Sequence, residues 1–409
     1  MALSEKEIAK KQILQTFRIG NIFMRVNGIS FIGNPPETFW GKLKVYVTFS
    51  ISILLVIYMV VGQISYTASL LVGSVSVDEL LRGYVHVAGY GVISFGKLIM
   101  VRYQNHAFRR LISELPDIWP GSGVDTASAE IKRSSLQALR IMQIFYTCWN
   151  VFGVLMFTVT PIALYVYKAI RGEPAQVGYI YHLYYPFDQT KPVNHVIVFC
   201  CEMCGGFSSV CAMLSADILF ITMASHISML LRILQVKIRR IGAPQQEDQG
   251  CQSPQDDYAM IVDVINIHQR LISYANDIEN AFTVVNLINV LLSSINICCV
   301  VFSVVFLDPL FEMSNKLFTG AALTQMGVVC WYADDIFRAS AGVSDAVYES
   351  GWYRCNPRSR RALLVMLQRS QRPLYFTALK FRPITMMTYS SILTTAYSYF
   401  TLLYTSYSE

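Results

Sequence analysis

Seven long apolar stretches divide the 409-residue chain, and they constrain its fold more than any other feature. Each is close to or above the roughly 20 residues that an α-helix needs to cross the hydrocarbon core of a bilayer. A helix satisfies its backbone hydrogen bonds internally, so it is the expected structure for such a stretch in lipid. The predicted spans are Val45–Ser65, Leu80–Met100, Ile141–Tyr167, His195–Met223, Phe282–Phe306, Leu317–Ile336 and Pro383–Tyr404.

The composition agrees with a location in lipid. Hydrophobic residues make up 54% of the chain and charged residues 15%, against about 25% charged residues in soluble proteins. The mean hydropathy is +0.41. We therefore expect an all-α integral membrane protein with seven transmembrane helices.

The basic residues predict the orientation of the chain. Of the 33 lysines and arginines, 27 lie in the amino-terminal segment and in the connections after the second, fourth and sixth spans, and five lie toward the other side, counting Arg82 at the start of the second span. Cytoplasmic loops carry the excess of positive charge in membrane proteins. The sequence thus predicts a cytoplasmic amino terminus and, after seven spans, an extracellular carboxyl terminus.

The connections on the predicted cytoplasmic side are long and have a helical pattern, which indicates a cytoplasmic helical anchor layer. In Ser225–Arg240, for example, an apolar stripe continues the fourth span. Separate helices lying on the inner leaflet are the alternative interpretation. The predicted organisation is a cytoplasmic segment (1–44), spans one to four (45–223), cytoplasmic helices (224–281) with a flexible loop (242–257), spans five and six (282–336), an anchor segment (337–382), and the last span with a short extracellular tail (383–409).

Charged side chains inside the spans are costly and indicate a function or a partner. We expect Asp217 to be a paired or snorkelling structural carboxylate, and Lys97 to reach lipid headgroups. Glu202 has two candidate contacts, a ligand and Lys191. Asp334 and Asp335 end the sixth span, and arginines such as Arg338 and Arg354 are their expected partners.

The sequence contains no local enzyme signature, no phosphate-binding glycine loop and no histidine pair with metal-binding spacing. Most of the ten cysteines lie in apolar runs and are interpreted as packing residues. We expect no catalytic residue, no metal and no cofactor. The net charge of +6 is explained by the cytoplasmic loops and requires no nucleic acid partner.

The last span carries a stripe of hydroxyl groups. Thr388, Ser391, Thr395 and Ser398 are spaced by three and four residues, and Leu402 and Thr405 continue on the same helix face. Such a stripe fits contact with another helix, because Ser and Thr commonly bond across packed membrane helices. It fits equally a pore lining in which Leu402 forms an apolar gate. The pattern alone does not decide between the two.

The chain resembles the insect odorant receptor family. The similarity is strongest at Ser391–Leu403, and the preceding segments Gln368–Leu374 and Thr377–Pro383 also match. Three further matches follow in the same order as in the family: Tyr184–Asp188, His268–Phe282 and Tyr348–Tyr353. The resemblance extends along the whole chain.

This resemblance implies a subunit of a ligand-gated, nonselective cation channel in the plasma membrane of a sensory neuron. It implies a heterotetramer with a shared co-receptor, cytoplasmic contacts between subunits, and a pore lined by the last helix. The implied pore and gate residues are Ser391, Thr395, Ser398, Leu402, Thr405 and Ser406. Leu402 falls at the gate. Ser406 is polar where the co-receptor carries a second apolar gate residue, which fits a subunit that needs a partner.

By the same resemblance, a small volatile odorant binds in the outer half of the bundle, between the second, third, fourth and sixth spans. A mostly apolar wall with scattered polar groups suits such a ligand. The outer halves supply His86, Tyr90, Phe157, Thr158, Phe207, Ser208, Cys211, Thr324 and Gln325.

Two other classes of membrane protein have features that the sequence lacks. A G-protein-coupled chemoreceptor also has seven spans, but its amino terminus is extracellular, contrary to the distribution of basic residues. A secondary transporter is expected to show inverted repeats and midplane charges, and Asp217 alone is little support. The related gustatory receptors end in a different carboxyl-terminal signature.

Overall fold

The computed structural model describes the backbone of residues 5–33, 36–72, 77–121, 125–173, 177–181, 183–185, 191–242, 254–306 and 313–408. Within these ranges, side chains are described except at 70–72, 77–89, 254–257, 298–306, 313–315, 403–404 and 406–408. The described elements are α1 (Glu5–Val26), α2 (Phe39–Val72), α3 (Val77–Glu114), η1 (Leu115–Asp117), α4 (Thr126–Ile170), α5 (Pro192–Arg239), α6 (Pro254–Phe306), α7 (Met313–Glu349), η2 (Trp352–Arg354), α8 (Pro357–Ser370), β1 (Thr377–Ala378), β2 (Arg382–Pro383) and α9 (Met386–Ser408).

The first six predicted spans lie within helices α2 to α7, and the seventh lies mostly in α9, which begins at Met386 because Pro383 belongs to β2. Among the described residues, four helical segments are long and apolar enough to cross a bilayer: Phe39–Ser69, Thr126–Ile170, Pro192–Arg239 and Tyr258–Ile297. The predicted spans in α3, α7 and α9 are more polar than these four. Polar and small residues are usual in membrane helices that pack mainly on other helices.

Helix α5 lies at the centre of the bundle and packs on α1, α2, α3, α4, α6 and α7. Every residue from Cys211 to Leu231 is buried, on all faces of the helix. A helix that is apolar on all sides is expected in such a central position. By contrast, α4 leaves one apolar flank uncovered, with Phe145, Phe152 and Leu155 exposed, as expected for a surface that faces lipid.

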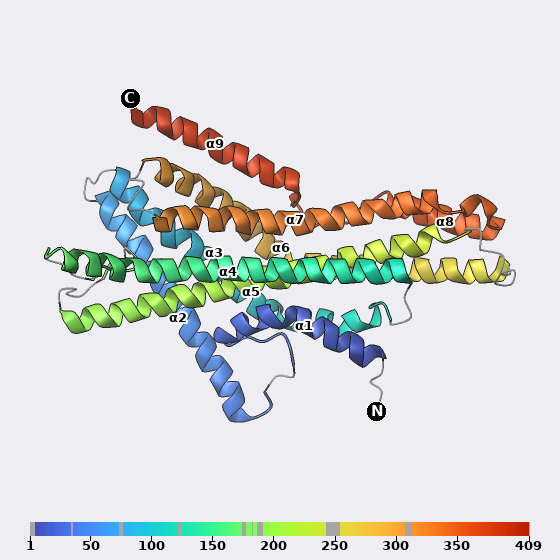
Figure 1. The fold of residues 1–409 in the computed structure, drawn as a ribbon, viewed down its shortest axis with the longest axis horizontal. Coiled ribbons are helices and arrows are strands. Elements are labelled where there is room, and N and C mark those ends of the chain that lie inside the picture. The colour runs from blue at the N-terminus through green and yellow to red at the C-terminus, as the bar shows by residue number, and fades with distance from the viewer. Residues whose placement is uncertain are drawn as a thin grey trace.

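Several helices continue well beyond a bilayer, and their ends form a layer with α8 (Figure 1). The 48 residues of α5 span about 72 Å, whereas the hydrocarbon core is about 30 Å thick. The continuity of α5 to Arg239 agrees with the apolar stripe predicted after the fourth span. We use the name anchor layer for the end of α5, the start of α6, the end of α7, and α8.

Ion pairs connect the helices of the anchor layer with one another and with the start of α4. Arg239 of α5 binds Glu349 of α7 at 2.6 Å, and Arg240 pairs with Asp125, which immediately precedes α4. The Arg240 guanidinium holds the pKa of the Asp125 carboxyl below its ordinary value. These pairs are largely exposed, so each contributes little stability. Their role is to select one arrangement of the helix ends.

A small hairpin leads the chain from α8 into α9. Strands β1 and β2 pair antiparallel, with Thr377 opposite Pro383. Glu279 of α6 accepts hydrogen bonds from the Thr377 backbone N–H at 3.0 and 3.1 Å and from its hydroxyl. Leu379 and Lys380 in the turn have φ of 49° and 61°, a left-handed conformation that is unfavourable for side chains of this size. The hairpin is thus attached to α6 just before α9 begins.

Candidate ligand cavity and pore-lining helix

A cavity lies between α2, α3, α4, α5 and α7, nearer the start of α5 than the anchor layer. The surrounding side chains leave about 670 Å³ of empty space, part of which is open to the surroundings. The described residues that line it are Met59, Tyr90, Gly91, Asn150, Gly153, Val154, Phe157, Tyr181, Gly206, Ser209, Val210, Leu317, Phe318 and Ala321.

Small residues on several helices create the empty space. A Cβ atom added at Gly153 of α4 would meet no atom within 4 Å, so this glycine opens directly into the cavity. At Gly91 of α3, an added Cβ would lie only 2.8 Å from a methyl group of Val60. Gly91 therefore allows α2 to approach α3, whereas Gly153 keeps the interior free.

Aromatic rings form much of the cavity wall. The ring centroids of Tyr90 and Phe318 are 4.4 Å apart, and Phe318 meets Phe157 edge to face at 6.2 Å. Phe157 is stacked on Tyr181 at 6.3 Å. Such a wall favours a compact, largely apolar molecule that is held by dispersion contacts.

Few polar groups face the cavity, and most of them are already engaged. The Asn150 amide donates to the carbonyl of Tyr146 at 2.8 Å, and the Ser209 hydroxyl bonds with that of Ser94. The buried Tyr90 hydroxyl finds no hydrogen-bond partner among the described residues. Because an unsatisfied buried donor is costly, Tyr90 suits a ligand with a hydrogen-bond acceptor.

Tyr90 and Phe157 line the cavity, as the resemblance implied. Four other residues from the predicted set point elsewhere: Ser208 donates to Asn27 of the loop after α1 at 2.7 Å, Gln325 to Asp217 at 3.3 Å, and Thr158 and Thr324 to backbone carbonyls in their own helices. Phe207 is exposed and Cys211 is buried away from the cavity. The side chain of His86 lies outside the described residues.

The predicted and the observed lining residues differ because the sequence does not give the rotation of each helix about its own axis. On α5, Gly206, Ser209 and Val210 face the cavity, whereas their neighbours Phe207, Ser208 and Cys211 do not. Adjacent residues on a helix point about 100° apart, so a shift of one position changes the wall. The glycines are the signal by which the cavity could have been found, because they mark positions where a span leaves space.

A buried ion pair lies one helical turn or more beyond the cavity, toward the anchor layer. Lys97 of α3 binds Asp217 of α5 at 2.6 Å, and their side chains are 0% and 2% exposed. Tyr146 of α4 donates to the second carboxylate oxygen at 2.9 Å, as does Gln325 of α7 at 3.3 Å. The pairing expected for Asp217 is confirmed, but the expectation that Lys97 reaches lipid headgroups is wrong.

From Thr395 onward the hydroxyl stripe of α9 faces away from its own chain, whereas its first member, Thr388, is buried and donates to the carbonyl of Pro383 at 2.7 Å. Ile392 and Ala396 are buried against the bundle, whereas Thr395, Ser398, Leu402 and Thr405 are exposed. Ser391 is half-buried at the edge of the stripe. Figure 1 shows α9 on the outer side of α6 and α7, with the carboxyl terminus at its far end. The side chain of Ser406 lies outside the described residues.

The hydroxyls in the stripe donate their protons within α9. Thr395 donates to the carbonyl of Ser391 at 2.8 Å, Ser398 to that of Thr394 at 3.0 Å, and Thr405 to that of Leu402 at 2.9 Å. A hydroxyl also has two acceptor lone pairs. With the proton directed to the backbone, the outward side of each group presents oxygen lone pairs.

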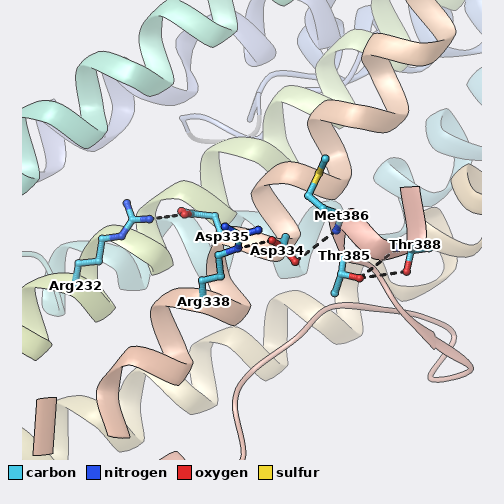
Figure 2. A network of polar contacts seen from close by, with 7 residues as sticks. All are labelled: Arg232, Asp334, Asp335, Arg338, Thr385, Met386 and Thr388. Carbon is cyan, nitrogen blue, oxygen red and sulfur yellow. Dashed lines mark hydrogen bonds and ion pairs between the residues drawn. The ribbon is translucent and has the colours of Figure 1, made fainter. Parts of the chain in front are cut away.

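A polar network attaches the start of α9 to α7, as Figure 2 shows. Asp334 of α7 accepts the backbone N–H of Met386 at 3.4 Å and binds Arg338 at 2.7 Å. Thr385 caps the helix by accepting the N–H of Thr388 at 3.4 Å. The neighbouring Asp335 pairs with Arg232 of α5. Arg338 is thus a partner of Asp334 as expected, while Asp335 binds an arginine that the sequence did not indicate.

Known proteins that are similar in sequence to this chain are odorant receptors. The family model described as 7tm odorant receptor matches residues 77–397. Odorant receptor 85b of Drosophila melanogaster is 23% identical over 396 residues, covering 96% of this chain and 99% of its own. Odorant receptor 22c of the same species is 28% identical over 254 residues, covering 61% of this chain and 63% of its own.

Solved structures show the same fold. The insect olfactory receptor OR5 from Machilis hrabei, in complex with eugenol, superposes with a TM-score of 0.80 over 98% of this chain and 100% of its own, at 17% identity. The same receptor in a second structure gives a TM-score of 0.77 at 18% identity.

A multi-pass helical membrane receptor with a cavity in its bundle is the class that this architecture defines. The chain belongs to the 7tm odorant receptor family, and it is a receptor and not an enzyme. The seven-helix architecture predicted from the sequence is confirmed by this membership.

Proposed function

We propose that the chain is a tuned odorant-binding subunit of a ligand-gated, nonselective cation channel. The observation that carries this proposal is that α7 takes part in both candidate sites. Leu317, Phe318 and Ala321 of α7 line the cavity, and Asp334 of the same helix binds the first N–H of α9. A helix is stiff over this length, so a ligand that shifts the cavity end of α7 also displaces the start of α9.

The cavity defines the class of ligand. Its wall is aromatic and aliphatic, and the Tyr90 hydroxyl is a donor without a partner among the described residues. A small volatile with an apolar body and one hydrogen-bond acceptor fits both properties. OR5 of Machilis hrabei, which shares the fold, has been solved with eugenol, which supports a cavity for a small organic molecule.

The exposed face of α9 supports a pore wall for cations. Oxygen lone pairs of Thr395, Ser398 and Thr405 point outward and replace water around a cation weakly. The α9 sequence contains no Asp or Glu, so the pore lacks the charged ring that gives strong discrimination among cations. Leu402, 61% exposed on the same face, is the proposed apolar gate.

The anchor layer offers a surface for contact between subunits. Large apolar side chains are exposed at the end of α7, in η2 and on α8, namely those of Tyr348, Trp352, Leu364 and Val365. A patch of this kind commonly marks a protein interface. We infer a heterotetramer with the family co-receptor, whose apolar residue would stand where this chain has Ser406.

The distribution of basic residues supports the proposed orientation. The anchor layer belongs to the side that carries 27 lysines and arginines, so it lies in the cytoplasm and the cavity lies toward the outside. The proposed location is the plasma membrane of an olfactory sensory neuron, where an airborne ligand reaches the outer half of the bundle.

The direct test is expression with the co-receptor and recording of currents during application of a broad panel of volatiles. We expect a volatile-evoked current that reverses near 0 mV in mixed sodium and potassium solutions, since the pore discriminates poorly. Surface delivery is checked with an epitope tag. A receptor that reaches the surface and responds to no volatile would contradict the proposal, as would an amino-terminal tag stained on unpermeabilised cells for the orientation.

A further inference from the structure

The connection between α4 and α5 contributes a side chain to the cavity. Its described residues are 171–173, 177–181, 183–185 and 191, and they have no helical or strand structure. Among the described residues that line the cavity, Tyr181 is the one that lies outside a helix. A loop residue in a wall made otherwise of helices needs contacts that hold its backbone in place.

One buried carboxylate binds this connection. Glu202 of α5 is 0% exposed, and it accepts the backbone N–H of Ile180 at 2.9 Å and that of Tyr181 at 3.3 Å. Its other oxygen accepts the hydroxyl of Tyr185. The contacts considered for Glu202 from the sequence were a ligand and Lys191, and among the described residues its carboxylate binds donors of this connection. The carboxylate satisfies backbone donors that a loop would otherwise leave exposed to water.

The opposite side of the connection is attached to α2. The backbone N–H of Tyr184 donates to the carbonyl of Gly62 at 3.1 Å. The side chain of Leu183 packs over Gly62 so closely that a Cβ there would lie 3.3 Å from the Cβ of Leu183. The connection therefore bridges α2 and α5 across the end of the cavity.

The ring of Tyr181 lies between Phe157 of α4 and Gly206 of α5. On one side it is stacked on Phe157, with an angle of 23° between the ring planes. On the other it approaches Gly206 of α5, where an added Cβ would lie 3.2 Å from Cζ of the tyrosine and still nearer to its hydroxyl oxygen. Burial raises the pKa of the Tyr181 hydroxyl above its ordinary value, with a smaller contribution from the charge of Glu202. The tyrosine is accordingly neutral at physiological pH.

We propose that Tyr181 is a specificity-determining lid on the ligand cavity, and that Glu202 is a positioning residue that acts through it. The inference rests on the proposed function, because it names a further residue of the same binding site. The phenol ring limits how far a ligand extends toward the connection. Glu202 sets the position of the ring, because its carboxylate accepts the backbone N–H of Tyr181.

The first experiment measures which ligand sizes are accepted. Straight-chain 2-ketones from three to ten carbons carry one acceptor for Tyr90 and differ only in length. With the co-receptor present, Tyr181→Ala is expected to shift the preference toward longer ketones, changing the ratio of half-maximal concentrations for a long and a short ketone by about tenfold. Tyr181→Phe, which keeps the ring, retains the order of the unmodified receptor. Tyr184→Ala is the matched control, since this exposed side chain lies on the same connection outside the cavity.

The second experiment tests whether Glu202 acts through Tyr181. Glu202→Ala is expected to shift the order of ketones in the same direction as Tyr181→Ala, and to add nothing in the Tyr181→Ala background. Glu202→Gln keeps an acceptor oxygen and is expected to retain part of the original order. Additive effects of Glu202→Ala and Tyr181→Ala would overturn the positioning role.

A third measurement does not depend on channel opening. Val154→Cys places a thiol in the cavity wall, and a membrane-impermeant methanethiosulfonate reagent is applied from outside to the intact heteromer. Peptide mass spectrometry gives the rate of modification at this position. The lid predicts a modification rate about tenfold higher with Tyr181→Ala or Glu202→Ala, and an unchanged rate with Tyr184→Ala. An unchanged rate in all three variants would refute the lid, whereas absence of any ketone or volatile response in the unmodified receptor would contradict the proposed function alone.

Discussion

The carboxylate of Asp334 in α7 accepts a hydrogen bond from the backbone N–H of Met386, the first residue of α9, at 3.4 Å. The first N–H groups of a helix have no partner within it, and a negative charge near them is favourable. A single side chain thereby connects the helix that lines the cavity with the helix that carries the hydroxyl stripe.

Replacing Asp334 is expected to weaken the response without abolishing it. Asp334→Asn keeps an acceptor oxygen but loses the charge, and a charge at a helix amino terminus contributes about 0.3–1 kcal/mol. We predict a shift of the half-maximal ligand concentration by roughly two- to fivefold, and a larger shift for Asp334→Ala. Asp335→Asn is the control, because its carboxylate pairs with Arg232 of α5 and forms no hydrogen bond with α9 among the described residues. Equal effects of the two substitutions would show that contact with α9 is not what matters.

Filling the cavity from Gly153 is expected to change ligand size preference. Since a Cβ at this position meets no atom within 4 Å, Gly153→Ala should fold normally and Gly153→Leu should extend into the empty space. We predict a progressive loss of response to the larger members of a ligand series, by about tenfold or more for leucine. Dose–response recordings measure it. Leu155→Phe adds bulk on the exposed flank of the same helix, so an equal loss there would contradict the assignment of the cavity.

Breaking the buried ion pair is expected to destabilise the receptor. Asp217→Ala leaves the Lys97 ammonium buried without its partner, which costs about 3–5 kcal/mol. Surface biotinylation and the melting temperature of the detergent-purified heteromer both measure the loss. The double variant Lys97→Met with Asp217→Leu removes both charges and is expected to recover most of the surface expression. A double variant as impaired as Asp217→Ala would mean that the bonds from Tyr146 and Gln325 dominate.

Making the proposed gate polar is expected to increase the current in the absence of ligand. Leu402→Ser removes an apolar group from the exposed face of α9, so water and ions would pass more readily. Leu402→Ile keeps the side chain apolar and serves as the control. Recording the basal current and the reversal potential with the co-receptor tests the assignment. If both quantities are unchanged in Leu402→Ser, Leu402 does not form the gate.

The sequence alone determined the elements that arise from local physics. Long apolar stretches predict helices because lipid offers the backbone no other hydrogen-bond partners, and α2 to α7 and α9 are found where these stretches lie. The stripe on α9 was predicted because residues spaced by three and four share a helix face whatever surrounds it. From Thr395 onward the stripe points away from the buried Ile392 and Ala396, as the pattern predicts, whereas Thr388 is buried where the first turn of α9 contacts the hairpin.

Tertiary structure decided which side chains meet across the bundle. Tyr90 and Phe157 were found to line the cavity as the resemblance implied, but Ser208 and Gln325 were not, because the rotation of each helix depends on packing against its neighbours. The partner of Lys97 lies 120 positions away on another helix, and Tyr181 reaches the cavity from a connection without periodicity. Hydropathy and spacing describe one helix at a time. The cavity, the buried pair and the contact of Asp334 with α9 exist only once several helices are packed together.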